Sequence, residues 1–97
     1  NFQIDIQVIN KGILSACKYD YVKMAKWFVT NYRIDMPTIV NGFLTACTCY
    51  STKIIEWFAQ NYQIDIRVIN KGFILACEDD YVEITSFTHH PFYEKFS

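Results

Sequence analysis

The side chains best suited to metal binding or nucleophilic chemistry are four cysteines and the adjacent pair His89-His90. Cys47 and Cys49 are separated by one residue, whereas paired zinc ligands usually have two or more residues between them. Adjacent histidines on a helix point about 100° apart, so this pair would not share a ligand face. No arrangement of Ser, His and Asp recurs, and the glycines are too far apart to form a phosphate-binding loop. We therefore expect a protein without metal, cofactor or catalytic residues.

Three of the cysteines, Cys17, Cys47 and Cys77, recur at an interval of thirty residues. If neighbouring copies of a repeat pack at about 10 Å, as helices do, their thiols lie too far apart for a disulfide, which needs Cα atoms within about 7 Å. A free cysteine packs as a small hydrophobic residue, so we expect these three to be buried. Cys49 falls in a predicted turn. Free thiols also indicate a reducing compartment, cytoplasmic or nuclear.

Charge is distributed unevenly along the chain, although the net charge is only −1. Residues 1–30 carry four Lys against two Asp, residues 31–60 are balanced, and residues 61–90 have a net charge of −3. The chain therefore has no overall attraction to nucleic acid, and its longest apolar runs are too short to span a membrane. The acidic cluster Glu78-Asp79-Asp80 and the basic front are explained most simply as a solvated surface, with head-to-tail association as the alternative.

The elements that must position these residues repeat every thirty residues. The segment GILSAC at 12–17 recurs as GFLTAC at 42–47 and as GFILAC at 72–77. A fixed period of this size is typical of a solenoid, which offers a long surface to a partner. A hydrophobic fraction of 52% excludes a disordered chain. We expect a single repeat domain over 1–97, with copies at about 1–30, 31–60 and 61–90 and a C-terminal tail at 91–97.

Each copy is predicted to begin with a helix that runs, in the first copy, from about Ile6 to Cys17. Its apolar residues fall on one stripe at helical spacing, and Pro37 suits the first turn of the middle copy. A glycine in mid-helix costs about 1 kcal/mol relative to alanine, so its recurrence predicts a close approach of the next helix. The expected core residues are Ile9, Ile13, Ala16 and Cys17, the expected N-caps are Asp5, Asp35 and Asp65, and the recurring glycines are Gly12, Gly42 and Gly72.

A second helix is predicted from about Tyr21 to Asn31, after a turn short enough to make the pair antiparallel. Its apolar side is formed by Val22, Ala25, Phe28 and Val29, and we expect the equivalent Trp27 and Trp57 to pack between repeats. The predicted caps of the second helices are Asp20, Ser51 and Asp80.

The third copy departs from this pattern. Thr85-Ser86-Phe87-Thr88 replaces two large apolar residues with hydroxyls, and Pro91 predicts that the helix ends near His89. A terminal repeat needs a wettable outer face, so this ending is interpreted as a C-terminal cap. The alternative is that Phe92, Tyr93 and Phe96 dock on further chain. Because the first residue is Asn1 rather than Met, we expect the protein to be part of a longer chain.

These segments resemble the ankyrin repeat. Leu75-Ala76-Cys77 matches the end of the family's first helix, Ile54-Ile55-Glu56-Trp57-Phe58 matches part of its second, and Ile64-Asp65 stands for its Ala-Asp. The period is 30 rather than 33, and Lys71-Gly72-Phe73-Ile74 replaces the Thr-Pro-Leu-His signature. Such divergent arrays are similar to those of amoebae and large DNA viruses, which would place a viral protein in the host cytoplasm. The resemblance covers about residues 1–88. It implies an all-α solenoid of three helix-turn-helix repeats with short or absent β-hairpin fingers.

The function expected from a solenoid is that of a non-catalytic scaffold, which binds another protein through a concave surface made by the first helices and the loops before them. The alternative is a structural segment that docks head-to-tail or into a larger assembly. The candidate partner-binding residues are Tyr32, Arg33, Tyr62 and Arg67 in the loops and helix starts, Asn10, Lys11, Asn41, Asn70 and Lys71 in the first helices, and Tyr19, Cys49 and Tyr50 at the turns.

Overall fold

The computed structural model of the chain describes residues 4–78 and is all-helical over that range, which confirms the predicted all-α class there. The predictions that concern Asp79, Asp80, the second helix of the third copy and His89-His90 lie outside the described residues. None of the helices between residues 4 and 78 is long and apolar enough to cross a membrane. In chain order the helices are α1 (Ile6–Lys18), α2 (Val22–Asn31), α3 (Met36–Thr48), α4 (Thr52–Asn61) and α5 (Ile66–Glu78).

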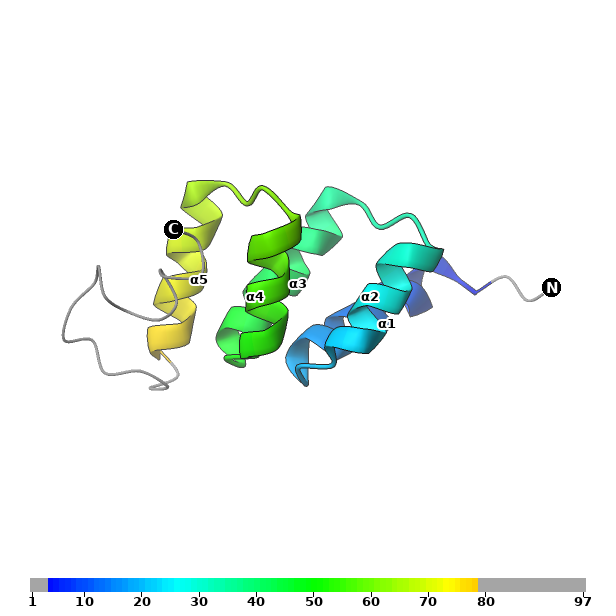
Figure 1. Ribbon diagram of the computed structural model, residues 1–97, viewed down its shortest axis with the longest axis horizontal. Coiled ribbons are helices and arrows are strands. Elements are labelled where there is room, and N and C mark those ends of the chain that lie inside the picture. Colours follow the sequence, from blue (N-terminus) through cyan, green and yellow to red (C-terminus); the bar gives the residue numbers. More distant parts are fainter. Residues whose placement is uncertain (1–3, 79–97) are drawn as a thin grey trace.

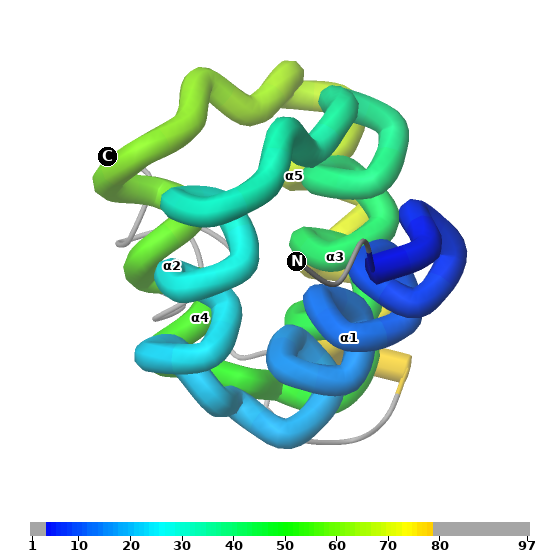
Figure 2. Tube along the Cα trace, turned by 90° about the vertical axis from the view of Figure 1, so that its right-hand side faces the viewer, coloured from blue at the N-terminus to red at the C-terminus, as the bar shows by residue number. Residues whose placement is uncertain are grey.

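The helices form two layers (Figures 1 and 2). The first helices α1, α3 and α5 lie in one row, in which α3 packs against both of its neighbours, and α2 and α4 cover the same side of that row. Tight turns at 19–21 and 49–51 make each pair an antiparallel hairpin, and the extended linkers 32–35 and 62–65 lead to the next hairpin. The thirty-residue period of the sequence is therefore also the period of the helix pairs.

Each first helix begins at the predicted aspartate. Each aspartate accepts a hydrogen bond through its Oδ1 atom from a backbone N–H group in the first turn of the helix. The donors are Gln7 for Asp5 at 2.8 Å, Thr38 for Asp35 at 2.9 Å and Arg67 for Asp65 at 2.8 Å. Pro37 lies in the first turn of α3, as predicted. Hydrogen bonds from Thr38 lower the pKa of Asp35, and hydrogen bonds from Arg67 lower the pKa of Asp65 to about 2. These two carboxylates are therefore negatively charged at neutral pH, and a negative charge near the N-terminus stabilises a helix.

The core lies between the two layers, and the mid-helix glycines allow the helices to approach closely there. A Cβ atom at Gly42 would lie 3.0 Å from the Sγ atom of Cys17 and 3.4 Å from the Phe58 ring, all of them buried. A Cβ atom at Gly12 would collide with the ring of Phe28. The predicted packing role of these two glycines is confirmed. The buried residues of α1 are the predicted four, Ile9, Ile13, Ala16 and Cys17.

Of the two predicted caps of second helices that lie within the described residues, neither Asp20 nor Ser51 caps its own helix with its side chain. Asp20 does not cap α2; its Oδ1 atom accepts a hydrogen bond of 2.9 Å from the amide of Ile54, in the first turn of α4 in the next repeat. Asp20 has φ 62°, so this turn carries its side chain away from its own helix. Ser51 precedes α4, but its hydroxyl donates to the carbonyl oxygen of Lys18 at 3.1 Å instead of capping α4. Two side chains of the turns thus join the first hairpin to the second.

Loss of the Asp20 contact should weaken the fold as a whole, because it leaves the Ile54 amide without its acceptor. We expect Asp20→Gly, which suits the positive φ, to lower the free energy of unfolding by about 1 kcal/mol, the net contribution of one hydrogen bond. Asp20→Ala adds the strain of the left-handed backbone and should lose about 2 kcal/mol. Asp20→Asn retains an acceptor and tolerates this φ, so it is the matched control. Urea unfolding followed by circular dichroism measures all three, and equal midpoints would show that the contact contributes nothing.

Candidate protein-interaction surface

The cysteines are placed for packing rather than for chemistry. All four are free, and Cys17 and Cys47 are fully buried as predicted. Burial raises the pKa of Cys17 to about 12 and also raises that of Cys47, which disfavours the reactive thiolate. Cys77 is only partly buried, unlike the other members of its set, and Cys49 is half-buried at the end of α3. No group of three His, Cys, Asp or Glu side chains within residues 4–78 is arranged to hold a metal ion.

A largely apolar row of side chains runs along one flank of the first helices, beside the core, and sequence reasoning missed it. Ile6, Met36 and Ile66 occupy one repeat position, and all three are exposed, at 63, 51 and 62%. Residues four apart on a helix are neighbours, so each is followed on the same face by two further stripe residues. Large exposed apolar patches usually mark binding sites. We define this first-helix face as Ile6, Asn10 and Leu14 in α1, Met36, Val40 and Leu44 in α3, and Ile66, Asn70 and Ile74 in α5.

The signal that could have revealed this stripe is its recurrence. Apolar residues recur at positions 6 and 14 of every copy, in addition to the four buried residues of α1, namely Ile9, Ile13, Ala16 and Cys17. Two predicted contact residues, Asn10 and Asn70, belong to the first-helix face, and Lys11, Asn41 and Lys71 are exposed directly beside it. The face therefore unites five of the predicted contacts.

A shallow groove of about 460 Å³ lies between α1 and α3 on this side of the molecule. Leu14 and Leu44 of the first-helix face supply its apolar part, whereas Lys18 and Asn41 supply polar groups at the edge. Cys49, a predicted contact at the turn, also lines the groove. The first-helix face thus combines apolar area with hydrogen-bonding groups, the combination found in protein interfaces.

The loop tyrosines among the predicted contacts pack against their own repeat. The Tyr32 ring lies 5.7 Å from the Trp27 ring, and the Tyr62 ring lies 5.8 Å from the Trp57 ring, both nearly perpendicular. Burial raises the pKa of Tyr62. Arg67 is exposed but forms an ion pair with Asp65 at 3.0 Å. Arg33 is exposed on the linker, three residues before Met36 in the sequence.

The turn residues among the predicted contacts differ in exposure. Tyr19 is exposed at the end of α1, and the Lys18 amino group lies 5.4 Å from the centre of its ring. Tyr50 is half-buried with φ 50°, and its pKa is raised by burial and by the charge of Cys77. Tyr50 is therefore less accessible to a partner than Tyr19.

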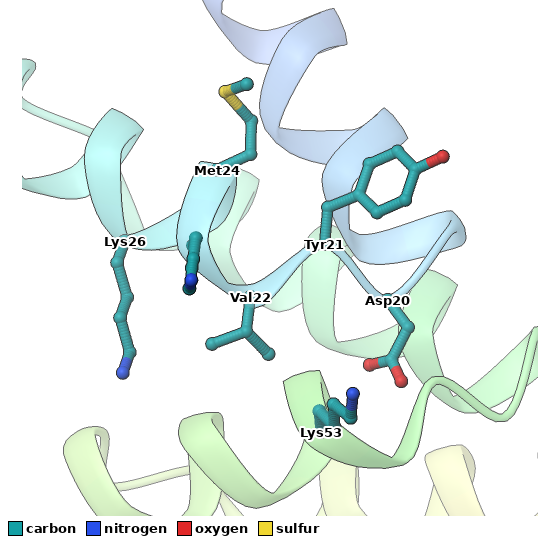
Figure 3. A pocket seen from close by; sticks show the side chains of 7 residues that line it. Asp20, Tyr21, Val22, Met24, Lys26 and Lys53 are labelled. Carbon is teal, nitrogen blue, oxygen red and sulfur yellow. The ribbon is translucent and has the colours of Figure 1, made fainter.

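The opposite side of the molecule carries a basic hollow of about 560 Å³ between α2 and the start of α4 (Figure 3). The hollow is lined by Lys23, Lys26 and Lys53 together with Asp20. The side chains of Val22 and Lys26 extend toward α4, whereas the side chain of Met24 points away from α4. The three lysines are exposed. An exposed cation in water binds an anion only weakly, so this hollow is a poorer candidate site than the apolar first-helix face.

Comparison with known proteins returns no family model, no curated protein and no solved structure that matches the chain.

Proposed function

We propose that the protein is a non-catalytic scaffold that binds another protein through the first-helix face. The observation that carries the proposal is the exposure of Ile6, Met36 and Ile66, which persists in the middle copy although α3 has neighbours on both sides. Apolar residues that stay exposed inside an array are not needed for its packing, and water disfavours them by about 25 cal/mol for each Å². A partner that covered Ile6, Met36 and Ile66 would remove the free-energy cost of exposing each of these three side chains to water.

The spacing of the stripes describes the partner. Packed helices lie about 8–10 Å apart, so the three stripes form steps of about that length. A chain in the polyproline II conformation repeats every three residues and about 9 Å. We therefore propose an extended partner segment with an apolar side chain at every third residue, and with carboxylates that reach Lys11 or Lys71 beside the face.

The proposal includes an ankyrin-like solenoid of three repeats in a reducing compartment, cytoplasmic or nuclear. Two features support the ankyrin comparison. The helix pairs follow one another in a row (Figure 1), and the turn position where the family has glycine is left-handed here, with φ 62° at Asp20 and 50° at Tyr50. The free and buried thiols of Cys17 and Cys47 support the reducing compartment.

Selection from a displayed library of random peptides tests the proposal without a known partner. We expect the selected peptides to share apolar residues at three-residue intervals, and Met36→Glu to weaken their binding by about tenfold or more, because it puts a charge into the apolar face. Met24→Glu is the matched control, since Met24 has nearly the same exposure but lies on α2, outside the first-helix face. A library that yields no binder, or binders that Met24→Glu removes and Met36→Glu does not, would refute the proposal.

A further inference from the structure

The groove between α1 and α3 is formed by residues from the interior of the array. The two helices run in the same direction (Figure 1), and they pack closely, because a Cβ atom at Gly42 would lie 3.0 Å from the Sγ atom of Cys17. The two walls of the groove therefore keep a fixed spacing, as a binding site requires. The α1 wall consists of Leu14 and Lys18, and the α3 wall consists of Asn41, Leu44, Thr45, Thr48 and Cys49.

Lys18 supplies the only charge among the described residues that line this groove. Its side chain is exposed, and no carboxylate between residues 4 and 78 pairs with it. Its carbonyl oxygen accepts the Ser51 hydroxyl at 3.1 Å, and its amino group lies 5.4 Å from the centre of the Tyr19 ring. The groove therefore ends in an unpaired cation whose backbone and side chain are both held in place.

Neutral hydrogen-bond donors lie on the opposite wall of the groove. Asn41 brings a side-chain amide and Thr45 brings a hydroxyl, whereas the Thr48 hydroxyl already donates to the carbonyl oxygen of Leu44 at 3.0 Å. A carboxylate accepts several hydrogen bonds, and bonds to an ionised group are stronger than bonds between neutral groups. One cation, one amide and one hydroxyl, with no carboxylate among the lining residues described, suit the acidic side chain of a partner.

The place of the groove in the first-helix face sets the place of that acidic residue in the partner. Leu14 and Leu44 belong both to the face and to the groove, and Lys18 lies one helical turn, about 6 Å, beyond Leu14. If apolar residues three apart in an extended segment contact α1 and α3, the two residues between them pass over the groove. A rise of about 3 Å for each residue keeps both within reach of the long Lys18 side chain.

The repeat makes this step of the face different from the next one. The positions equivalent to Lys18 are Thr48 in α3 and Glu78 in α5, and all three are exposed. The cation at the end of a first helix is therefore found only in the first of the three copies, and Glu78 would repel a carboxylate at the corresponding end of α5. An acidic residue thus favours one placement of the segment on the three helices.

We propose that the groove between α1 and α3 is an acidic-residue subsite, in which Lys18, Asn41 and Thr45 bind an Asp or Glu side chain of the partner segment. The inference rests on the proposed scaffold function and deepens it, because it specifies one polar residue of the partner and the interval that contains it. Lys18 is the specificity-determining residue of this subsite.

Parallel selections from a displayed library of random peptides, on the wild-type chain and on Lys18→Glu, test this subsite. We expect wild-type binders to carry Asp or Glu between two apolar residues three apart, and binders of Lys18→Glu to carry Lys or Arg there. Lys53→Glu is the matched control, because it makes the same charge change at an exposed lysine of α4 outside the groove. It should select the same acidic residue as the wild type.

Fluorescence anisotropy of one selected peptide, and of a copy in which the acidic residue is changed to its amide, measures the contact directly. Lys18→Gln avoids a negative charge at the helix C-terminus and should weaken binding of the acidic peptide by about three- to fivefold at low salt. The same variant should change binding of the amide copy by less than about twofold, and about 0.5 M salt should reduce the difference. Circular dichroism shows that each variant is folded.

The outcomes separate this inference from the scaffold proposal. A library that yields no binder overturns both. Binders with the three-residue apolar spacing but no acidic preference overturn the subsite alone, and so does an acidic preference that Lys18→Glu leaves unchanged. Equal weakening of the acidic peptide and its amide copy by Lys18→Gln would also overturn the subsite, because it would show that Lys18 does not contact the carboxylate.

Discussion

Phe43→Ala should lower the free energy of unfolding by about 3–5 kcal/mol, as truncation of a buried aromatic residue does. Phe43 is fully buried in α3, which packs against both α1 and α5, and its ring meets the Phe58 ring edge-on at 5.8 Å. The change removes contacts from the central helix of the row, and a chain of this length is stable by only about 5–15 kcal/mol. Urea unfolding followed by circular dichroism should show a large fall in midpoint.

The repeat supplies a matched control for this change. The first copy has Ile13 where the second has Phe43, and Ile13 is equally buried, so Phe43→Ile should cost only about 1 kcal/mol. Leu44→Ala, at the next residue of the same helix, removes a half-buried side chain of the first-helix face and should cost much less than Phe43→Ala. Equal midpoints for Phe43→Ala and Leu44→Ala would contradict a core centred on α3.

The first helices could be predicted from the sequence because each determinant is local. Asp35 lies three residues before the amide that it caps, and the core positions of α1 follow from the helical period alone. The cap of α4 could not be predicted in this way, because its acceptor, Asp20, lies 34 residues before Ile54. Sequence spacing carries no information about which turn lies beside which helix start, and the left-handed backbone at Asp20 is not visible in a propensity argument.

The proposed interaction surface follows from the sequence only in part, for a similar reason. Residue type alone predicts that Lys11 and Asn41 are exposed, but it does not distinguish the exposed Ile6, Met36 and Ile66 from a buried residue such as Ile9. The different exposure of Trp27, at 46%, and Trp57, at 8%, could not be predicted either, because the two residues are identical in type and repeat position. Their difference arises from the neighbouring copy, which only the packed structure contains.

The buried thiols should be the slowest groups in the chain to react with iodoacetamide. The pKa of Cys17 is raised from 9.0 to about 12 by burial, which leaves about a thousandfold less thiolate at neutral pH, and Cys47 is shielded in the same way. We expect rapid modification at half-buried Cys49 and slow modification at Cys17 and Cys47, followed residue by residue with mass spectrometry. In urea all four thiols should react at similar rates, which provides the control. Modification of Cys17 within about tenfold of the rate at Cys49 in the folded protein would show that α1 and α3 separate often, because the Cys17 thiol is covered at Gly42.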